Sequence, residues 1–180
     1  MIKNVCAFTG HRPRKFPWGY NEQDGRCVVL KDVLTVQIKR LVGLGYTDFL
    51  SGMAEGADTW AALAVLVVRK ENPALKLHCA LPCEGQADKW TASARELYSS
   101  ILNQADSITY VSREYNKNCM LKRNRYMVDH AACLLAIYNG DQRGGTAMKV
   151  RYAQKLGREV IMINPLSRNI THTRSHVPLN

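Results

Sequence analysis

The sequence predicts an α/β protein built on an open parallel sheet of about six strands, with helices on both faces. Six short apolar runs alternate with stretches in which apolar residues recur at helical spacing. The runs are apolar almost throughout, as expected for strands that are buried on both faces of a sheet. With 180 residues, 46% of them hydrophobic, the chain is long enough to form one domain around a substantial core.

The expected strands are recognised by their length and by the glycine, proline and polar residues that bound them. Each run is shorter than an ordinary helix, and together they make the parallel sheet. The six runs cover residues 5–9, 49–51, 75–81, 107–111, 132–138 and 160–163.

Three helices are predicted in the first part of the chain. Apolar residues recur at three- and four-residue spacing over residues 30–41, 60–67 and 90–101. The first helix is expected to end near Gly43 or Gly45. About sixteen residues without clear periodicity separate the first strand from this helix. A loop of that length in a compact domain is usually functional or mobile.

Residues 119–151 are the stretch around which the rest of the chain is organised. A basic helix-like segment with Arg123 and Arg125 precedes the fifth strand, and residues 139–145 then form a glycine-containing loop. Thr146 is the predicted N-cap of the last helix. A strand, a glycine loop and a helix N-terminus in this order suit an anion, most often a phosphate, because unpaired N–H groups and a positive dipole end meet there.

Positive charge is concentrated in the last third of the chain. Residues 1–112 contain 13 Lys and Arg against 11 Asp and Glu, whereas residues 113–180 contain 12 against 4. The net charge of +10 therefore suggests a polyanionic partner, either a phosphorylated small molecule or nucleic acid.

The six cysteines are scattered along the chain. No apolar run is long enough to span a membrane, and no signal peptide is evident. We therefore expect reduced thiols, no metal site, no membrane span and a cytoplasmic location.

The loops that follow the strands are where a ligand is expected, since ligands of such sheets bind beyond the carboxyl ends of the strands. Gly10 would let the backbone approach a ligand closely. Glu55 could accept hydrogen bonds from ribose hydroxyls or act as a general base, and Asp58 could be a helix cap or a ligand contact. The candidate ligand-binding residues are Gly10, His11, Arg12, Gly52, Glu55, Asp58, Arg123, Arg143, Gly144, Gly145 and Thr146.

Two common phosphate-binding motifs are absent from the sequence. Neither G-x-G-x-x-G after the first strand nor G-x-x-x-x-G-K-[ST] occurs, which excludes a standard dinucleotide-binding Rossmann enzyme and a P-loop NTPase. Trp60 and Trp90 fit the core faces of helices, so Trp18, in a loop, is the better candidate for stacking on a base. Arg123 and Arg125 are two residues apart on a helix and point to different sides, so at most one of them is expected to face the site.

Four segments resemble the YpsA-like proteins of the SLOG superfamily. They are TGHRP, SGMAEGAD, ALPCEGQADKW and the stretch from RNRYMVDH to KVRYAQ, and the resemblance covers nearly the whole chain to about Pro165. The superfamily also includes the Lonely Guy (lysine-decarboxylase-like) phosphoribohydrolases and the DNA-processing DprA proteins. The resemblance implies a Rossmann-like fold that binds a nucleotide-derived ligand at its glycine loops, with a sensing role.

The chain departs from the motifs that the phosphoribohydrolases carry. Met120, Arg123 and Met127 match Met-x-x-Arg-Lys-x-x-Met, with asparagine in place of lysine. The sequence 144–146 keeps a shortened form of Pro-Gly-Gly-x-Gly-Thr-x-x-Glu, and Lys149 occupies the position of the glutamate. The resemblance therefore implies that an arginine for phosphate remains while the acid that assists glycosidic cleavage is missing.

The hypothesis from the sequence is a single SLOG-type domain, residues 1–166, followed by a loose polar tail, residues 167–180. It binds or senses ADP-ribose, NAD or a mononucleotide-like ligand and requires no cofactor. One alternative is a nucleotide-cleaving enzyme in which Glu55 is the catalytic acid. The other is a DprA-like nucleic-acid-binding module, and a homo-oligomer is compatible with each.

Overall fold

The computed structural model describes residues 4–173 of the chain. Its centre is a seven-stranded sheet with the strand order β4-β3-β2-β1-β5-β6-β7, in which β1 to β6 are parallel and β7 is antiparallel to β6. The α/β, Rossmann-like prediction is confirmed. The strands are β1 (Val5–Gly10), β2 (Asp48–Ser51), β3 (Lys76–Leu81), β4 (Ser107–Tyr110), β5 (Cys133–Ile137), β6 (Glu159–Ile163) and β7 (Ile170–Thr173).

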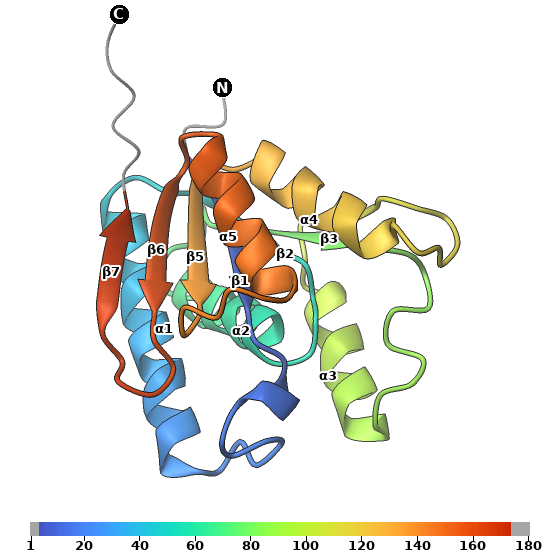
Figure 1. Cartoon of the computed structure of the whole chain (residues 1–180), viewed down its shortest axis with the longest axis horizontal. Coiled ribbons are helices and arrows are strands. Elements are labelled where there is room, and N and C mark those ends of the chain that lie inside the picture. Colours follow the sequence, from blue (N-terminus) through green and yellow to red (C-terminus); the bar gives the residue numbers. More distant parts are fainter. Residues whose placement is uncertain (1–3, 174–180) are drawn as a thin grey trace, which may run out of the picture.

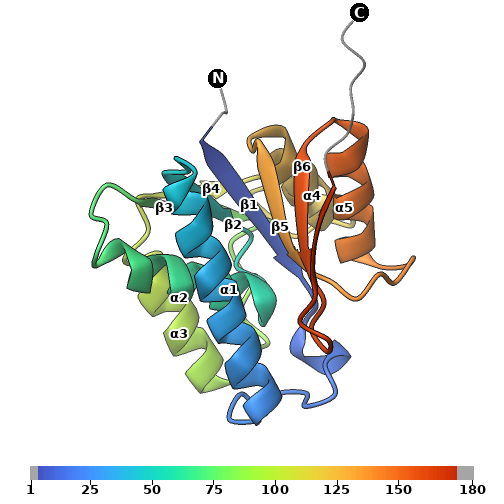
Figure 2. The same cartoon turned by 90° about the vertical axis from the view of Figure 1, so that its left-hand side faces the viewer.

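Helices cover both faces of the sheet, so the molecule has three layers (Figures 1 and 2). Helices α1, α2 and α3 lie on one face, and α4 and α5 lie on the other, as Figure 2 shows in side view. The helices are α1 (Gly25–Gly43), α2 (Ala57–Arg69), α3 (Ala92–Leu102), α4 (Cys119–Asp129) and α5 (Gly145–Lys155), with a short 3-10 helix, η1 (Pro13–Lys15).

The alternation of side chains along the central strands divides the core into two halves. In β1, Cys6 and Phe8 pack with residues of α1 and α2, whereas Ala7 packs with residues of α4 and α5. In β5, Leu135 likewise belongs to the first half and Leu134 to the second. Because successive strand residues point to opposite faces, a strand buried on both faces must be apolar throughout. This explains the uninterrupted apolar runs of the sequence.

The order of the strands reverses beside β1. From β1 the chain adds β2, β3 and β4 on one side, and then returns to place β5 on the other side of β1. The backbone N–H of His11, just after β1, donates a hydrogen bond to the Ile137 carbonyl at the end of β5, at 3.3 Å. The two loops that follow these strands therefore start side by side, at the position where sheets of this kind bind ligands.

Three local predictions are wrong. Thr146 is not an N-cap, because α5 begins at Gly145 and Gly144 caps it. Trp90 does not lie on the third helix, whose N-cap is Thr91. Part of the expected loose tail, Ile170–Thr173, is strand β7, which pairs with β6; residues 174–180 lie outside the described part of the chain.

Between residues 4 and 173, no helix is long and apolar enough to cross a membrane. The same residues contain no group of three or more His, Cys, Asp or Glu placed to hold a metal ion.

Candidate functional site

A cavity of about 460 Å³ opens at the point where β1 and β5 end. In Figure 1 these strand ends point downward, towards the short blue helix η1. Residues of the loops after β1, β2 and β5 contribute to the wall, together with side chains from α2, α4 and α5. The lining residues are Thr9, Gly10, His11, Arg12, Arg14, Lys15, Ala54, Asp58, Tyr115, Met120, Arg123, Asn124, Arg143, Gly144, Gly145, Thr146 and Lys149.

The loop after β1 brings three cations, Arg12, Arg14 and Lys15, to one wall of the cavity. This loop is shaped by η1 and is anchored by aromatic side chains. The Phe16 ring stacks on Trp18, with centroids 4.9 Å apart, and on Trp60 at 5.2 Å.

The prediction that Trp18 is a platform for a base is therefore wrong. Its side chain is buried in the core, where it holds the loop. Arg14 and Lys15 were not among the predicted site residues, although the sequence HRPRK places three basic side chains within four residues.

Two glycines of the site are required by close packing of the protein on itself. A Cβ atom at Gly10 would lie 2.3 Å from the Cβ of Ala57, so the glycine allows the first turn of α2 to approach β1. A Cβ atom at Gly52 would lie 2.3 Å from Nη1 of Arg123. Gly52 thus leaves space for the guanidinium group, and its carbonyl accepts a hydrogen bond from Arg123 Nη1. Neither contact needs a ligand.

The loop between β5 and α5 forms the opposite wall. Gly144 has a φ of +100°, a backbone conformation that favours glycine, and α5 begins at the next residue. The Thr146 hydroxyl, in the first turn, donates to the carbonyl of Gly10 at 3.0 Å and so joins the two loops. Gly144, Gly145 and Arg143 are exposed. The first N–H groups of an α-helix have no partner within the helix, so an anion at this wall can accept hydrogen bonds from them.

The floor of the cavity holds two buried cations and one buried carboxylate, at Arg123, Lys149 and Asp58. Arg123 Nη1 lies 4.0 Å from Asp58 Oδ2. Arg123 also donates through Nε to the side chain of Asn124 at 3.0 Å. Burial lowers the pKa of Arg123 from its usual value, and the nearby Asp58 opposes this shift. Arg125, in contrast, lies over the ring of Tyr152 on the outer surface, so only one of the two arginines faces the site, as predicted.

Lys149 reaches the floor from α5 and is only 3% exposed. Its Nζ donates to the carbonyl of Phe8 at 3.2 Å and contacts Sδ of Met127 at 3.4 Å. Burial lowers the pKa of Lys149 to about 7; Asp58 opposes this shift and Arg123 adds to it. Lys149, which occupies the position of the glutamate in the phosphoribohydrolase motif, therefore lines the cavity, and we did not predict this.

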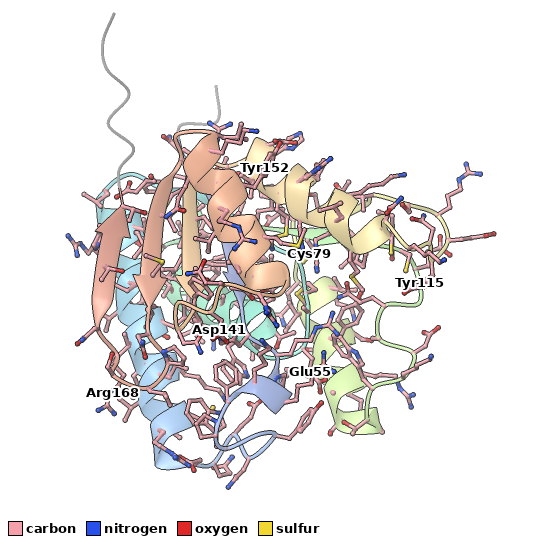
Figure 3. The ribbon with its side chains drawn as sticks, viewed as in Figure 1. Glu55, Cys79, Tyr115, Asp141, Tyr152 and Arg168 are labelled. Carbon is pink, nitrogen blue, oxygen red and sulfur yellow. The ribbon has the colours of Figure 1, made fainter. Side chains whose placement is uncertain are left out.

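Glu55 stands apart from the other predicted residues because it does not line the cavity. Burial raises the pKa of Glu55, with the positive charge of Arg12 opposing the shift. Figure 3 shows Glu55 at the same end of the sheet as Asp141 of the β5–α5 loop, whereas Tyr152 lies at the far end of α5. Gly52 contributes through its hydrogen bond with Arg123, and the other nine predicted ligand-binding residues all line the cavity.

His11 and Tyr115 complete the wall. The imidazole of His11 is buried, and its Nε2 lies 2.8 Å from Oδ1 of Asn139 in the β5–α5 loop. Tyr115, in the loop before α4, is 74% exposed and is the one aromatic side chain apart from His11 that lines this cavity in the described residues. A flat, exposed ring beside a cluster of cations is suited to stacking on a nucleobase.

Comparison with known proteins shows the family of this chain. The family model YpsA, described as the YspA SLOG family, matches residues 6–165. The SPbeta prophage-derived protein YoqJ of Bacillus subtilis (strain 168) is 32% identical over 151 residues, which cover 76% of this chain and 88% of that protein. A UPF0398 protein of Bacillus pumilus (strain SAFR-032) is 31% identical over 153 residues, covering 83% and 81%. The chain therefore belongs to the YpsA family of SLOG proteins.

Proposed function

We propose that this protein binds a nucleotide-derived ligand, such as ADP-ribose, NAD or a mononucleotide, with a phosphate group in the cavity at the ends of β1 and β5. The observation that supports this most strongly is the charge of the cavity floor. Two buried cations, Arg123 and Lys149, share one buried carboxylate, Asp58. A buried charge without a partner is costly, so a bound anion would stabilise the floor when both cations are charged.

The wall of the cavity also favours a bound anion. Arg12, Arg14 and Lys15 on one side and Arg143 on the other are cations at its rim. The N-terminus of α5 adds unpaired N–H groups and the positive end of the helix dipole. A phosphate offers several acceptor oxygens and negative charge to these donors, and the exposed ring of Tyr115 is available to the base.

The number and position of carboxyl groups at the cavity support binding with a sensing or regulatory role, without cleavage of the ligand. Glycosidic cleavage of a nucleotide would need a carboxyl group that acts as an acid or base near the ribose. Asp58 is the only carboxyl side chain that lines the cavity in the described residues, and it lies against Arg123. Glu55 lies outside the lining. We therefore propose that the site does not hydrolyse its ligand.

A nucleotide panel in a thermal unfolding assay tests the proposal. A ligand that binds only the folded protein adds about 2.7 kcal/mol at a concentration of about 100 Kd, a shift of several degrees. We expect ADP-ribose, NAD or AMP to give such a shift, and Arg143→Gln to reduce it. No shift with any of them at millimolar concentration would contradict the proposal.

The Tyr115→Ala variant distinguishes recognition of the base from recognition of the phosphate. Loss of a stacking contact costs about 1–3 kcal/mol for each base, which corresponds to a loss of roughly fivefold to 150-fold in affinity. The variant should therefore bind AMP more weakly, while its affinity for inorganic phosphate stays that of the wild type. An unchanged affinity for AMP, or an equal loss for both ligands, would contradict stacking of the base on Tyr115.

Single-stranded nucleic acid is the second candidate ligand, favoured by Tyr115 beside the rim cations. A single aromatic platform supports weak, mainly electrostatic binding, whose affinity falls steeply with salt. Tight binding of an oligonucleotide that persists at high salt, together with no response to mononucleotides, would favour this candidate over the small ligand.

A further inference from the structure

Lys149 occupies an environment that suits a neutral amine better than an ammonium group. An ammonium group has three donors. Within the described residues, the acceptors within hydrogen-bond distance of Lys149 Nζ are one carbonyl oxygen, that of Phe8, and one thioether sulfur, that of Met127. A thioether is a weak acceptor. The charged form of Lys149 therefore lacks a strong partner for at least one N–H group.

The charges around Lys149 come from α4, which packs against its own helix α5, and from the first turn of α2, which lies on the other face of the sheet. Asp58 of α2 favours its charged form, while Arg123 of α4 and burial favour its neutral form. Asp58 also lies 4.0 Å from Arg123 Nη1, so one carboxylate serves two cations. Lys149 lines the cavity in which we place the phosphate. A negative group in that cavity would supply the acceptor and the charge that the ammonium form lacks.

We propose that Lys149 is a ligand of the bound phosphate and takes up a proton from solution when the phosphate enters the cavity. This inference rests on the proposed function and adds a residue and a regulation to it. The amine nitrogen accepts one proton, becomes an ammonium group and donates a hydrogen bond to a phosphate oxygen. Binding is then linked to pH, because the free protein must gain a proton that it holds only in part near neutrality.

The linkage predicts how affinity depends on pH. Above about pH 7 the free protein increasingly holds neutral Lys149, so affinity should fall by up to about tenfold for each pH unit. Below that pH the lysine is already charged and this contribution is constant. A pKa of about 7 in the free protein also means that binding at pH 8 should take up nearly one proton per ligand.

Isothermal titration calorimetry with ADP-ribose at pH 8 measures this proton directly. The titration is repeated in buffers with different ionisation enthalpies, and the slope of the observed enthalpy gives the number of protons taken up. ADP-ribose is a suitable probe because its diphosphate lacks the second phosphomonoester ionisation, which lies near pH 6. The expected result for the wild type is an uptake close to one proton.

Three variants assign the proton to its residue. Lys149→Met keeps the length of the side chain without the amine, and should bind ADP-ribose more weakly with no proton uptake. His11→Gln removes the imidazole of the wall and should retain the uptake, because the proton is taken up by Lys149. Arg143→Gln removes a rim cation, and should lower affinity while the uptake stays close to one.

The outcomes separate this inference from the proposed function. No heat with ADP-ribose or inorganic phosphate would contradict both. Binding without proton uptake, or uptake that persists in Lys149→Met, would contradict the inference and leave the phosphate site intact. If Lys149→Met does not fold, the pH titration of the wild-type lysine by NMR, with and without ADP-ribose, decides: a ligand that leaves the titration of Lys149 unchanged would overturn the inference.

Discussion

The buried amine of Lys149 should make the stability of the protein depend on pH in a way that one substitution removes. Burial lowers the pKa of Lys149 to about 7 in the folded state, from an ordinary value of 10.5. Between these two values the unfolded chain holds a proton on this lysine that the folded protein has released. The free energy of unfolding therefore rises with pH in this window, by up to about 1.4 kcal/mol per pH unit from this group.

The size of this change in the free energy of unfolding follows from the interval between the two pKa values of Lys149. Between pH 7 and pH 9 the contribution of Lys149 to the free energy of unfolding should increase by about 2 kcal/mol. Below pH 7 the folded lysine is charged as well, so the contribution no longer changes. Lys149→Met has no titrating group at this position. Its free energy of unfolding, relative to that of the wild type, should therefore fall by about 2 kcal/mol over the same two pH units.

Urea unfolding of both proteins at pH 7, 8 and 9, without ligand, measures the difference. All other ionisable groups are shared, so their contributions cancel when the two proteins are compared. Two parallel pH profiles would show that Lys149 keeps its ordinary pKa in the folded protein. That result would refute the reasoning from its burial and its neighbours.

Four further substitutions test other contacts of the site. Arg123→Met breaks the buried ion pair with Asp58, so it should lower the free energy of unfolding by about 3–5 kcal/mol in urea titrations. A loss below 1 kcal/mol would contradict the contribution of this pair. Gly52→Ala places a methyl group against the Arg123 guanidinium and should lower the free energy of unfolding by about 1–3 kcal/mol in the same assay. Gly43→Ala is the matched control: it adds a methyl group in open space on a helix and should not lower the free energy of unfolding. Trp18→Ala removes a buried ring that holds the η1 loop and should lower the free energy of unfolding by about 3–5 kcal/mol. A variant as stable as the wild type would mean that the aromatic stack does not anchor this loop. Glu55→Gln should leave the affinity for ADP-ribose, measured by calorimetry, close to that of the wild type because Glu55 does not line the cavity. A loss of tenfold or more would show that Glu55 contacts the ligand. Release of base from AMP by the wild type but not by the variant would show that Glu55 is catalytic.

The order of strands and helices could be predicted from the sequence because each central strand is buried on both faces. Such strands are apolar without interruption, as in Cys133–Ile137, and helices such as α2 show a regular apolar face. Strand β7 was missed for the opposite reason. It is an edge strand of four residues with two exposed side chains, so its sequence lacks the apolar pattern of a central strand.

The loops that form the site could be predicted because ligands bind where parallel strands end. The individual roles were harder to predict, because they depend on contacts between distant segments. Trp18 lies in a loop, yet its ring is buried in the core and stacks on Phe16, which itself stacks on Trp60. Gly10 matches a glycine that admits a ligand, yet the group that approaches it is the Cβ of Ala57. Lys149 is a common surface residue type, and only the packing of α5 against β1 shows that its amine is buried.

NMR chemical-shift mapping with ADP-ribose tests the central claim most directly, since it reports both binding and its location in a protein of 20.3 kDa. If the phosphate lies at the N-terminus of α5, the backbone amides of Gly144, Gly145 and Thr146 should shift most, together with those of His11 and Arg12 after β1. The amides of α1 and β7 should remain unchanged. No shifts at millimolar ADP-ribose, or shifts that cluster away from the ends of β1 and β5, would contradict the claim that this cavity is a phosphate site.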